Sequence, residues 1–163
     1  IWNAVEAAIP GFLQNVYAHT AGGGKFLGIL QVKKRQPADE GRQGQAALLA
    51  LATYSELKNI ILVDEDVDLF DSDDILWATT RMQGDVSITT IPGIRGHQLD
   101  PSQTPEYSPS IRGNGISCKT IFDCTVPWAL KSHFERAPFA DVDPRPFAPE
   151  YFARLEKNQG SAK

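Results

Sequence analysis

The chain has 163 residues, of which 42% are hydrophobic and 22% are charged, with a formal net charge of −4. This composition is that of an ordinary globular domain, and it excludes a disordered acidic tail or a collagen-like chain. The length predicts one domain, and the absence of a basic stripe argues against nucleic acid as a partner. The apolar runs are too short for a membrane span, and we expect no signal peptide at the start of the chain.

The first eleven residues have the make-up of the end of a helix. Apolar side chains at Trp2, Val5 and Ile9 form a short amphipathic stretch, which a proline and a glycine then end. The chain also opens on isoleucine rather than on methionine. We therefore expect residues 1–11 to be the end of an interdomain linking helix, and the chain to be part of a longer protein.

The first half of the chain predicts three strands and a helix. Apolar and polar residues alternate on either side of a triple glycine, and an alanine- and leucine-rich stretch with an apolar stripe follows. The next run, KNIILV, is almost wholly aliphatic, which is typical of a strand buried on both faces of a sheet. The predicted ranges are 12–20, 26–33 and 58–63 for the strands and 43–55 for the helix.

The second half predicts further elements around a long loop. Asp71 or Ser72 can cap a helix that Gly84 ends, and β-branched residues mark another strand. A stretch rich in proline and glycine follows, and its length indicates an ordered, functional loop. The predicted ranges are 71–82, 127–136 and 150–157 for helices, 86–91 and 119–125 for strands, and 92–114 for the loop.

This alternation of strands and helices predicts an α/β fold. A strand buried on both faces needs cover on both sides, so we expect a three-layer arrangement, a sheet with helices on both faces, in a single domain. The domain is expected to span residues 12–137. Residues 138–163 are expected to form a proline-rich connector and a terminal helix.

The two cysteines, Cys118 and Cys124, lie six residues apart in one segment, without a third cysteine to complete a zinc site. If the segment is extended, both lie on one face and are too far apart to form a disulfide. We expect reduced core thiols, as is typical of a cytoplasmic protein.

An acidic run, Asp64–Asp68, directly follows the buried aliphatic strand. Ligands of open α/β sheets bind at this edge, so the run could hold a divalent metal ion, as receiver domains hold magnesium. The alternative is structural, an acidic turn that caps the next helix or lies at a domain or subunit contact. The run holds more acids than one receiver site uses, which favours the structural interpretation.

His97 and Lys119 are further candidates. His97 lies in the long loop between Arg95 and Asp100, where it can exchange a proton or a hydrogen bond with a ligand; the alternative is a solvated surface histidine. Lys119 follows a glycine-rich approach and suits a phosphate, although two glycines and one lysine do not make a phosphate-binding loop.

Four stretches, taken together, resemble the UbiD-like decarboxylases. They are IILVDEDVD at 60–68, DILWATTR at 74–81, HQLDPS at 97–102 and KTIFDCT at 119–125. The stretch HQLDPS is similar to the H-x-LDPS form found in the branch of the family that acts on hydroxybenzoates such as gallate and protocatechuate. The four stretches occur in the same order as in the family, over about residues 12–136. Together they therefore make a more specific resemblance than any one of them makes alone.

The resemblance implies a subunit with a flavin-binding domain, a linking helix and a C-terminal α/β domain used in oligomerisation, and this chain resembles only the last. The family uses prenylated FMN, with a divalent metal ion and potassium, for reversible non-oxidative decarboxylation of aromatic or α,β-unsaturated acids. Its proton-transfer residues and metal ligands belong to the flavin domain. We therefore expect no catalytic residue in this chain, no cofactor bound by it alone, and no activity of the chain alone.

Four positions carry over from the family. The resemblance implies that His97 hydrogen-bonds ring hydroxyls, that Leu99 packs on the aromatic ring and that Asn59 lines the pocket. Lys119 would approach the cofactor or the domain interface.

These expectations describe the oligomerisation and substrate-capping domain of a decarboxylase of aromatic hydroxy acids. Its expected partners are further copies of the subunit, the flavin domain and an aromatic acid, with no nucleic acid and no membrane. The alternatives are a purely structural oligomerisation module and a receiver-like signalling domain.

Overall fold

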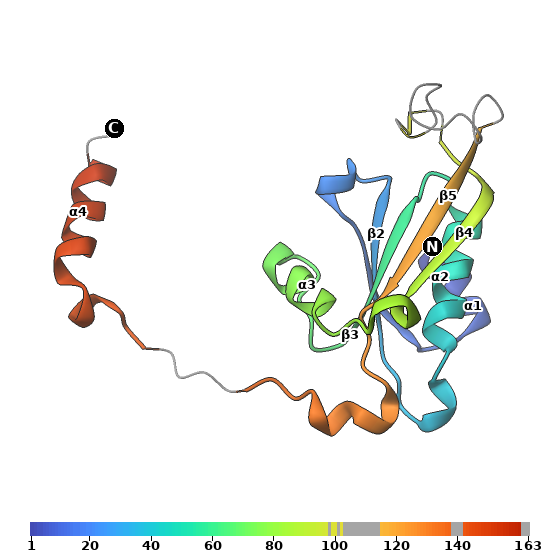
Figure 1. The fold of residues 1–163 in the computed structure, drawn as a ribbon, viewed down its shortest axis with the longest axis horizontal. Helices are drawn as coiled ribbons and strands as arrows, with labels where there is room; N and C mark the ends of the chain where they lie inside the picture. The colour runs from blue at the N-terminus through green and yellow to red at the C-terminus, as the bar shows by residue number, and fades with distance from the viewer. Residues whose placement is uncertain (98, 101, 103–114, 138–141, 161–163) are drawn as a thin grey trace.

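The structure is a computed structural model that describes residues 1–97, 99–100, 102, 115–137 and 142–160. One five-stranded sheet, with the order β1-β2-β3-β5-β4, lies between helices (Figure 1). The strands are β1 (Leu13–Ala18), β2 (Leu27–Val32), β3 (Asn59–Asp64), β4 (Ile88–Arg95) and β5 (Ile116–Asp123). The α-helices are α1 (Trp2–Ala8), α2 (Arg42–Thr53), α3 (Ser72–Thr79) and α4 (Pro149–Gly160), and a 3₁₀ helix, η5 (Trp128–His133), follows β5.

The three central strands, β2, β3 and β5, run parallel, and each edge strand runs antiparallel to its neighbour. The sheet therefore has one end at which the central strands begin and an opposite end at which they finish. We call these the amino end and the carboxyl end; they lie at the top and at the bottom of the sheet in Figure 1.

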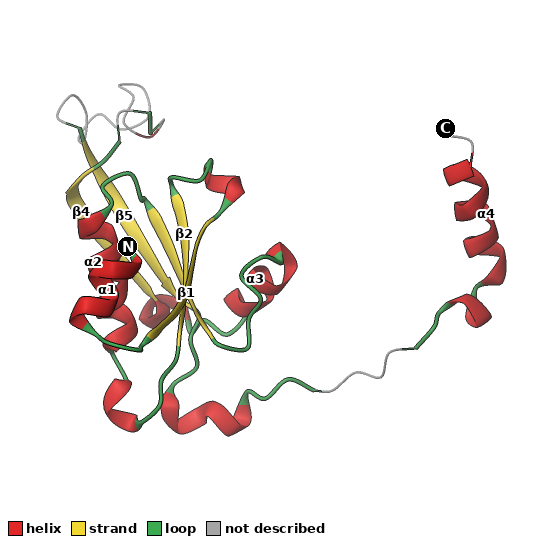
Figure 2. Cartoon of the chain, turned by 180° about the vertical axis from the view of Figure 1, so that it is seen from behind, coloured by secondary structure: helices red, strands yellow, loops and turns green. Residues whose placement is uncertain are grey.

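β3 is buried on both faces, as its aliphatic sequence predicts. Ile60 and Leu62 belong to an apolar cluster with residues of α1 and α2, whereas Val63 belongs to a second cluster with Ile75 and Ala78 of α3. β2 alternates in the same way between the two clusters. The helices on the two faces of the sheet (Figure 2) confirm the predicted three-layer α/β fold.

β4 is longer than predicted, because it continues through a proline and a glycine. The register of its pairing with β5 shifts between Ile91 and Ile94, and Gly93 within this irregularity has a φ of 76°. A proline is tolerated here because β4 is an edge strand, so one of its sides needs no ladder hydrogen bond.

β5 is displaced from its predicted range of 119–125. It begins at Ile116, where pairing with β4 starts, and it ends at Asp123. The carboxylate of Asp123 accepts hydrogen bonds from the backbone N–H and the hydroxyl of Thr125, at 3.0 and 2.6 Å. Such a side-chain bond to the following backbone competes with a strand ladder and turns the chain.

Residues 127–136 do not form the predicted α-helix. The 3₁₀ helix η5 takes their place, and none of its residues is buried. The Trp128 N–H donates to Glu40, and the Lys131 ammonium donates to the Lys34 carbonyl. A short segment held by these contacts with distant parts of the chain, without a buried apolar face, lacks the packing that stabilises most α-helices.

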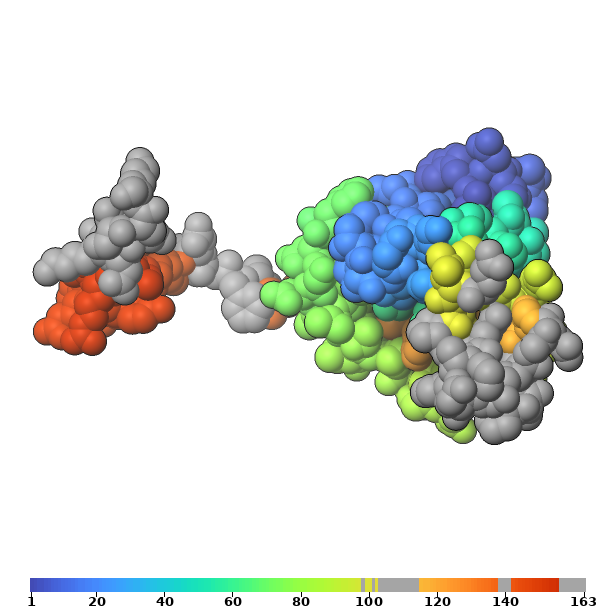
Figure 3. All heavy atoms as spheres, turned by 90° about the horizontal axis from the view of Figure 1, so that it is seen from above, coloured from blue at the N-terminus to red at the C-terminus, as the bar shows by residue number. Residues whose placement is uncertain are grey.

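The two ends of the chain differ in how they pack. α1 buries Val5 in the cluster with α2, whereas α4 stands apart from the sheet in Figures 1 and 3. The predicted roles of residues 1–11 as a linking helix and of 138–163 as a connector stay predictions. Residues 98, 101 and 103–114 of the predicted loop, and 138–141 of the connector, lie outside the described residues.

Truncation of a leucine in the double-buried strand should destabilise the fold. Leu62→Ala removes a side chain with no exposed surface, and we expect a loss of about 3 kcal/mol in the free energy of unfolding. Leu76→Ala is the matched control, because that side chain in α3 is 62% exposed and its loss should cost less than about 0.5 kcal/mol. Urea denaturation measures both, and equal losses would contradict the assigned burial.

Candidate functional site

The predicted substrate residues gather at the amino end of the sheet. Asn59 opens β3 and pairs with Leu27 and Thr120 of the neighbouring strands. His97 and Leu99 follow the last residue of β4, which pairs with the first residue of β5. The acidic run Asp64–Asp68, which begins at the end of β3, lies at the opposite end of the sheet.

Both ring nitrogens of His97 have partners. Nε2 lies 3.2 Å from Oε1 of Glu56, and Nδ1 accepts a hydrogen bond from the Leu99 N–H at 3.2 Å. The ring meets the Phe26 ring edge-on, with 6.1 Å between centroids. His97 is thus held in place by its neighbours, which argues against the solvated surface histidine of the alternative interpretation.

Glu56 is a member of this site that sequence reasoning missed. Its carboxylate accepts a hydrogen bond from the Tyr54 hydroxyl at 2.9 Å and lies 3.6 Å from Nζ of Lys25. The Tyr54 hydrogen bond, together with His97 and Lys25, outweighs burial and holds the pKa of Glu56 below its usual range. Neither a motif nor a spacing points to Glu56, because its turn meets the His97 turn only in the folded chain.

The turn that carries His97 is fixed by a buried carboxylate. Asp100 is 3% exposed and accepts hydrogen bonds from Lys58 at 2.8 Å and from Ser117 at 3.1 Å. Burial alone would raise the pKa of Asp100, but the hydrogen bonds from Lys58 and Ser102 outweigh it and lower the pKa. Asp100 therefore ties the His97 turn to the residue before β3 and to the second residue of β5.

Leu99 and Asn59 differ in how accessible they are. The side chain of Leu99 is 65% exposed, so an apolar group beside His97 faces solvent and can contact a ligand or another domain. Asn59 is half-buried. Their predicted role in binding substrate stays a prediction.

Lys119 is buried rather than directed toward a ligand. It has no exposed surface, and its ammonium donates to the carbonyl of Ser55 at 2.7 Å and to that of Leu57. Burial lowers the pKa of Lys119, and the charge of Asp100 opposes that shift. These contacts give Lys119 a structural role in the described residues, while its predicted approach to a cofactor or a domain interface stays a prediction.

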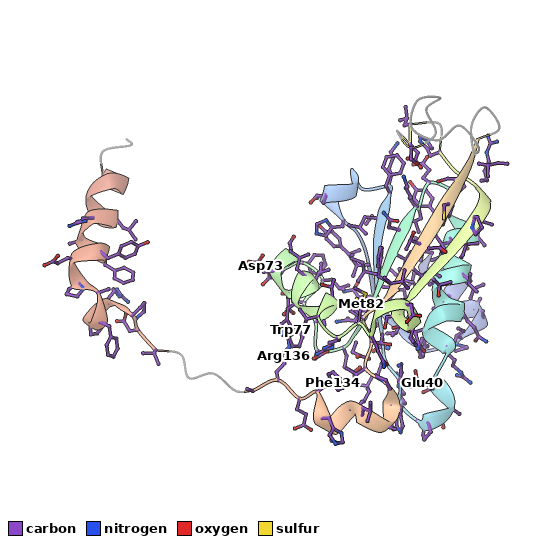
Figure 4. The ribbon with its side chains drawn as sticks, in the orientation of Figure 1. Glu40, Asp73, Trp77, Met82, Phe134 and Arg136 are labelled. Atoms are coloured by element: carbon purple, nitrogen blue, oxygen red, sulfur yellow. The ribbon has the colours of Figure 1, made fainter. Side chains whose placement is uncertain are left out.

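The acidic run at the carboxyl end is extensively paired. Arg81 binds the carboxylate of Asp66, and Arg136 lies 2.7 Å from Asp74. Both guanidinium groups lie over the Trp77 ring, at 4.3 and 3.7 Å from its centroid, and Figure 4 places Arg136 next to Trp77. These cation–π contacts and ion pairs tie the end of β3 to α3 and to the segment after η5.

Asp64 lines a cavity of about 580 Å³ at the same end. Its Oδ2 accepts a hydrogen bond from the Val126 N–H at 2.7 Å, whereas Oδ1 and the Nε of Arg81 are buried without a partner among the described residues. Burial raises the pKa of Asp64 to about 6, against the opposing Val126 hydrogen bond and nearby cations. A water molecule can satisfy two orphaned groups of this kind, a donor and an acceptor.

Glu40 joins three elements near this cavity. It accepts hydrogen bonds from Lys34 at 2.8 Å, Gln43 at 3.0 Å and the Trp128 N–H at 2.7 Å. The side chain of Lys34 is buried, and its ammonium also donates to the Val126 carbonyl at 2.9 Å. The carboxyl end is therefore closed by a polar network that links β2, α2 and the chain after β5.

The contacts support the structural interpretation of Asp64–Asp68. Within the described ranges, no group of three or more His, Cys, Asp and Glu side chains is arranged to hold a metal ion. Asp64, Glu65 and Asp66 each have a cation within 4 Å, and the carboxylate of Asp68 accepts the Phe70 N–H at 2.9 Å.

Two further expectations concern the cysteines and the membrane. Both cysteines are free, and Cys124 is buried while Cys118 is partly exposed, so only Cys124 is fully a core thiol. Burial raises the pKa of Cys124 to about 12, which keeps it in the unreactive thiol form. In the part of the chain that the structure describes, we find no helix with the length and apolarity that a membrane span requires.

Comparison with known families gives a match over most of the chain. Residues 1–124 match the family described as the 3-octaprenyl-4-hydroxybenzoate carboxy-lyase C-terminal domain. The gallate decarboxylase of Lactiplantibacillus plantarum is 51% identical over 144 residues, which are 87% of this chain and 29% of that protein.

Solved structures agree with this match. The apo 3,4-dihydroxybenzoic acid decarboxylase of Klebsiella pneumoniae is 99% identical, with a TM-score of 0.80, over 93% of this chain and 31% of that chain. The UbiD-class enzyme HmfF of Pelotomaculum thermopropionicum, in complex with FMN, is 27% identical with a TM-score of 0.73, over 87% of this chain and 29% of that chain. This chain thus spans about 30% of the length of the relatives it matches.

Removal of the Lys119 ammonium should destabilise the fold. Lys119→Met keeps most of the buried volume but leaves the Ser55 and Leu57 carbonyls without their donor, so we expect a loss of about 2 kcal/mol in the free energy of unfolding. In the control Lys33→Met, the lost group is exposed and lies 3.8 Å from Glu65, and its removal should cost less than about 0.5 kcal/mol. Stability equal to wild type in Lys119→Met, measured by urea denaturation, would refute the structural role.

Asp64 should make the fold more stable as the pH falls. The folded chain holds the Asp64 proton with a pKa of about 6, whereas an unfolded chain releases it near 3.9, so lowering the pH from 7.5 to 4.5 favours the folded state through this group. We expect the unfolding free energy of wild type minus that of Asp64→Asn to rise by about 2 kcal/mol over this range. The subtraction cancels the other acids, and a flat or falling difference would contradict the raised pKa.

Proposed function

Since this chain belongs to the UbiD carboxy-lyase family through its C-terminal domain, we propose that it is the substrate-capping and oligomerisation domain of a decarboxylase of aromatic hydroxy acids. The observation that carries the proposal is the 99% identity, over 93% of this chain, with the 3,4-dihydroxybenzoic acid decarboxylase of Klebsiella pneumoniae. The proposed reaction is the non-oxidative loss of carbon dioxide from 3,4-dihydroxybenzoate.

A closely related substrate is the second candidate. The gallate decarboxylase of Lactiplantibacillus plantarum is 51% identical over 87% of this chain, and gallate has one more ring hydroxyl than 3,4-dihydroxybenzoate. The same contacts in this chain can serve both acids, because each presents adjacent ring hydroxyls. The family match leaves the receiver-like alternative without support.

The cofactor of the proposed reaction is assigned to a domain outside this chain. Prenylated FMN, with its divalent metal ion and potassium, supplies the electron sink for decarboxylation in the family. The described residues do not fit a flavin phosphate or metal site, because the ammonium of Lys119 is used by two carbonyls and the acids at the carboxyl end are paired with cations. The proposed role of this chain therefore includes no contact with the cofactor.

The amino end of the sheet supplies what a cap needs. His97 is a polar group held by its neighbours, and Leu99 beside it is an exposed apolar side chain. We assign His97 a hydrogen bond to a ring hydroxyl, Leu99 a packing contact with the ring, and Asn59 a place in the pocket wall. Closure of such a surface over the substrate excludes water, which strengthens the electrostatic interactions inside the site.

The proposed partners are further copies of the subunit and the flavin-binding domain of the same enzyme. A purely structural oligomerisation module remains the rival, because it needs the same fold without a contribution to the pocket. The free thiols Cys118 and Cys124 support a reducing compartment such as the cytoplasm.

Truncation of His97 distinguishes the cap from the rival. In the full-length protein that carries this chain, assayed with prenylated FMN and 3,4-dihydroxybenzoate, we expect His97→Ala to lower kcat/KM about tenfold or more, because its hydrogen bond to the ring hydroxyl is lost. The control is His133→Ala, which alters an exposed histidine in η5 at the opposite end of the sheet.

The possible outcomes separate the proposals. Unchanged turnover of His97→Ala, with normal assembly by size-exclusion chromatography, would support the structural module instead. A wild-type enzyme that decarboxylates neither 3,4-dihydroxybenzoate nor gallate would overturn the proposed reaction.

A further inference from the structure

The hydrogen bonds of His97 determine which ring nitrogen carries the proton. The Leu99 N–H can only donate, so Nδ1, which lies 3.2 Å from it, must be the acceptor. A neutral imidazole with an acceptor at Nδ1 carries its proton on Nε2. That proton points to Glu56 Oε1, 3.2 Å away, which is a carboxylate and can only accept when ionised.

Glu56 has a partner at each carboxylate oxygen. Its second oxygen accepts the Tyr54 hydroxyl at 2.9 Å and lies 3.6 Å from Lys25, and these contacts contribute to its lowered pKa. The backbone around it is fixed as well, because the Lys119 ammonium binds the carbonyls of Ser55 and Leu57, the residues on either side of Glu56. The carboxylate therefore has little freedom to leave the imidazole.

From this arrangement we propose that Glu56 is a positioning residue that holds His97 in its Nε2–H form, so that Nδ1 accepts a hydrogen bond from a phenolic hydroxyl of the substrate. The inference rests on the proposed function, because it assigns the direction of the hydrogen bond that His97 makes to the ring hydroxyl. It adds a residue, Glu56, that lies outside the four stretches on which the sequence resemblance rests.

In the absence of substrate, the Leu99 N–H donates to Nδ1, and a phenolic hydroxyl of the substrate would replace it as the stronger donor. The Leu99 hydrogen bond of 3.2 Å lies at the long end of the usual range, and a phenolic O–H forms shorter bonds than an amide N–H. An exchange of the Leu99 N–H for a phenolic donor would place the ring of the substrate next to the exposed Leu99 side chain. A methoxy group cannot make this exchange because it has no proton to donate.

The pairing can be tested on the 163-residue chain without any enzyme assay. In ¹H–¹⁵N spectra of histidine-labelled chain, we expect a protected Nε2–H resonance of His97 that is shifted downfield by the carboxylate. Glu56→Gln keeps the shape but removes the charge, so the resonance should move upfield; in Glu56→Leu it should disappear through exchange with water. Glu65→Gln, an exposed acid at the opposite end of the sheet, is the control and should change nothing.

The consequence for substrate binding is tested in the full-length enzyme. We expect Glu56→Leu to raise KM for 3,4-dihydroxybenzoate about tenfold with a small change in kcat, because the lost hydrogen bond is one that substrate and transition state share. Glu56→Leu placed in a His97→Ala background should cost less than about twofold more, because Glu56 acts only through His97. Wild type should disfavour one of the two mono-O-methylated analogues by about tenfold or more, and this preference should disappear in both single variants.

Each result decides between the assignments. A proton on Nδ1 of His97, or an unchanged Nε2–H resonance in Glu56→Leu, would overturn the pairing whatever the enzyme does. Additive losses in the double variant would overturn the positioning role, since they would mean that Glu56 acts independently of His97. If the Glu56–His97 pairing is intact but the wild-type enzyme is inactive, the result counts against the proposed function. The assigned direction of the hydrogen bond from substrate to His97 would then be overturned as well.

Discussion

The amino end of the sheet depends on the ammonium group of Lys119. This side chain reaches from β5 to the carbonyls of Ser55 and Leu57 and has no exposed surface. A buried lysine carries a desolvation cost that hydrogen bonds must offset, so a position of this kind indicates that the contacts are strong. Because Glu56 lies between those two carbonyls and contacts His97, the bond from β5 also determines where the imidazole of His97 lies.

The two ends of the sheet differ in how their charged and polar side chains are paired. At the carboxyl end, acidic and basic side chains pair with one another, and Trp77 lies beneath two guanidinium groups, so most of these charged groups have a partner within the domain. At the amino end, a held histidine lies beside an exposed leucine. Open α/β sheets generally bind ligands at the carboxyl ends of their strands. In this domain we propose that the amino end meets the partner, as a cap that closes over a site built elsewhere would require.

The sheet and the turn that carries His97 have different roles in this arrangement. The domain provides a rigid three-layer support, and the proposed reaction takes place against a turn, residues 97–100, that Asp100 ties to β3 and β5 through Lys58 and Ser117. A site carried by a turn can adapt to substrate, while buried hydrogen bonds keep its anchor in place. The chain spans about 30% of the length of its relatives, so the proposal assigns the remaining chemistry to the part of the protein outside this chain.

The sequence alone determined the layers of this protein, because burial leaves a local pattern: the aliphatic run of β3 needs cover on both faces, and Asp71 caps α3 as its side chain predicts. The resemblance of contiguous stretches to a known family also marked His97 and Leu99, and it marked Asn59 as the residue just before the aliphatic run. Only the tertiary structure decided what those residues touch. Glu56 and His97 are 41 positions apart in the chain, and Lys119 and Ser55 are 64 apart, so no local pattern records either contact. The same reason explains why η5 is not the predicted α-helix: its conformation depends on contacts with Glu40 and Lys34, far away in the chain, rather than on the propensity of its own residues.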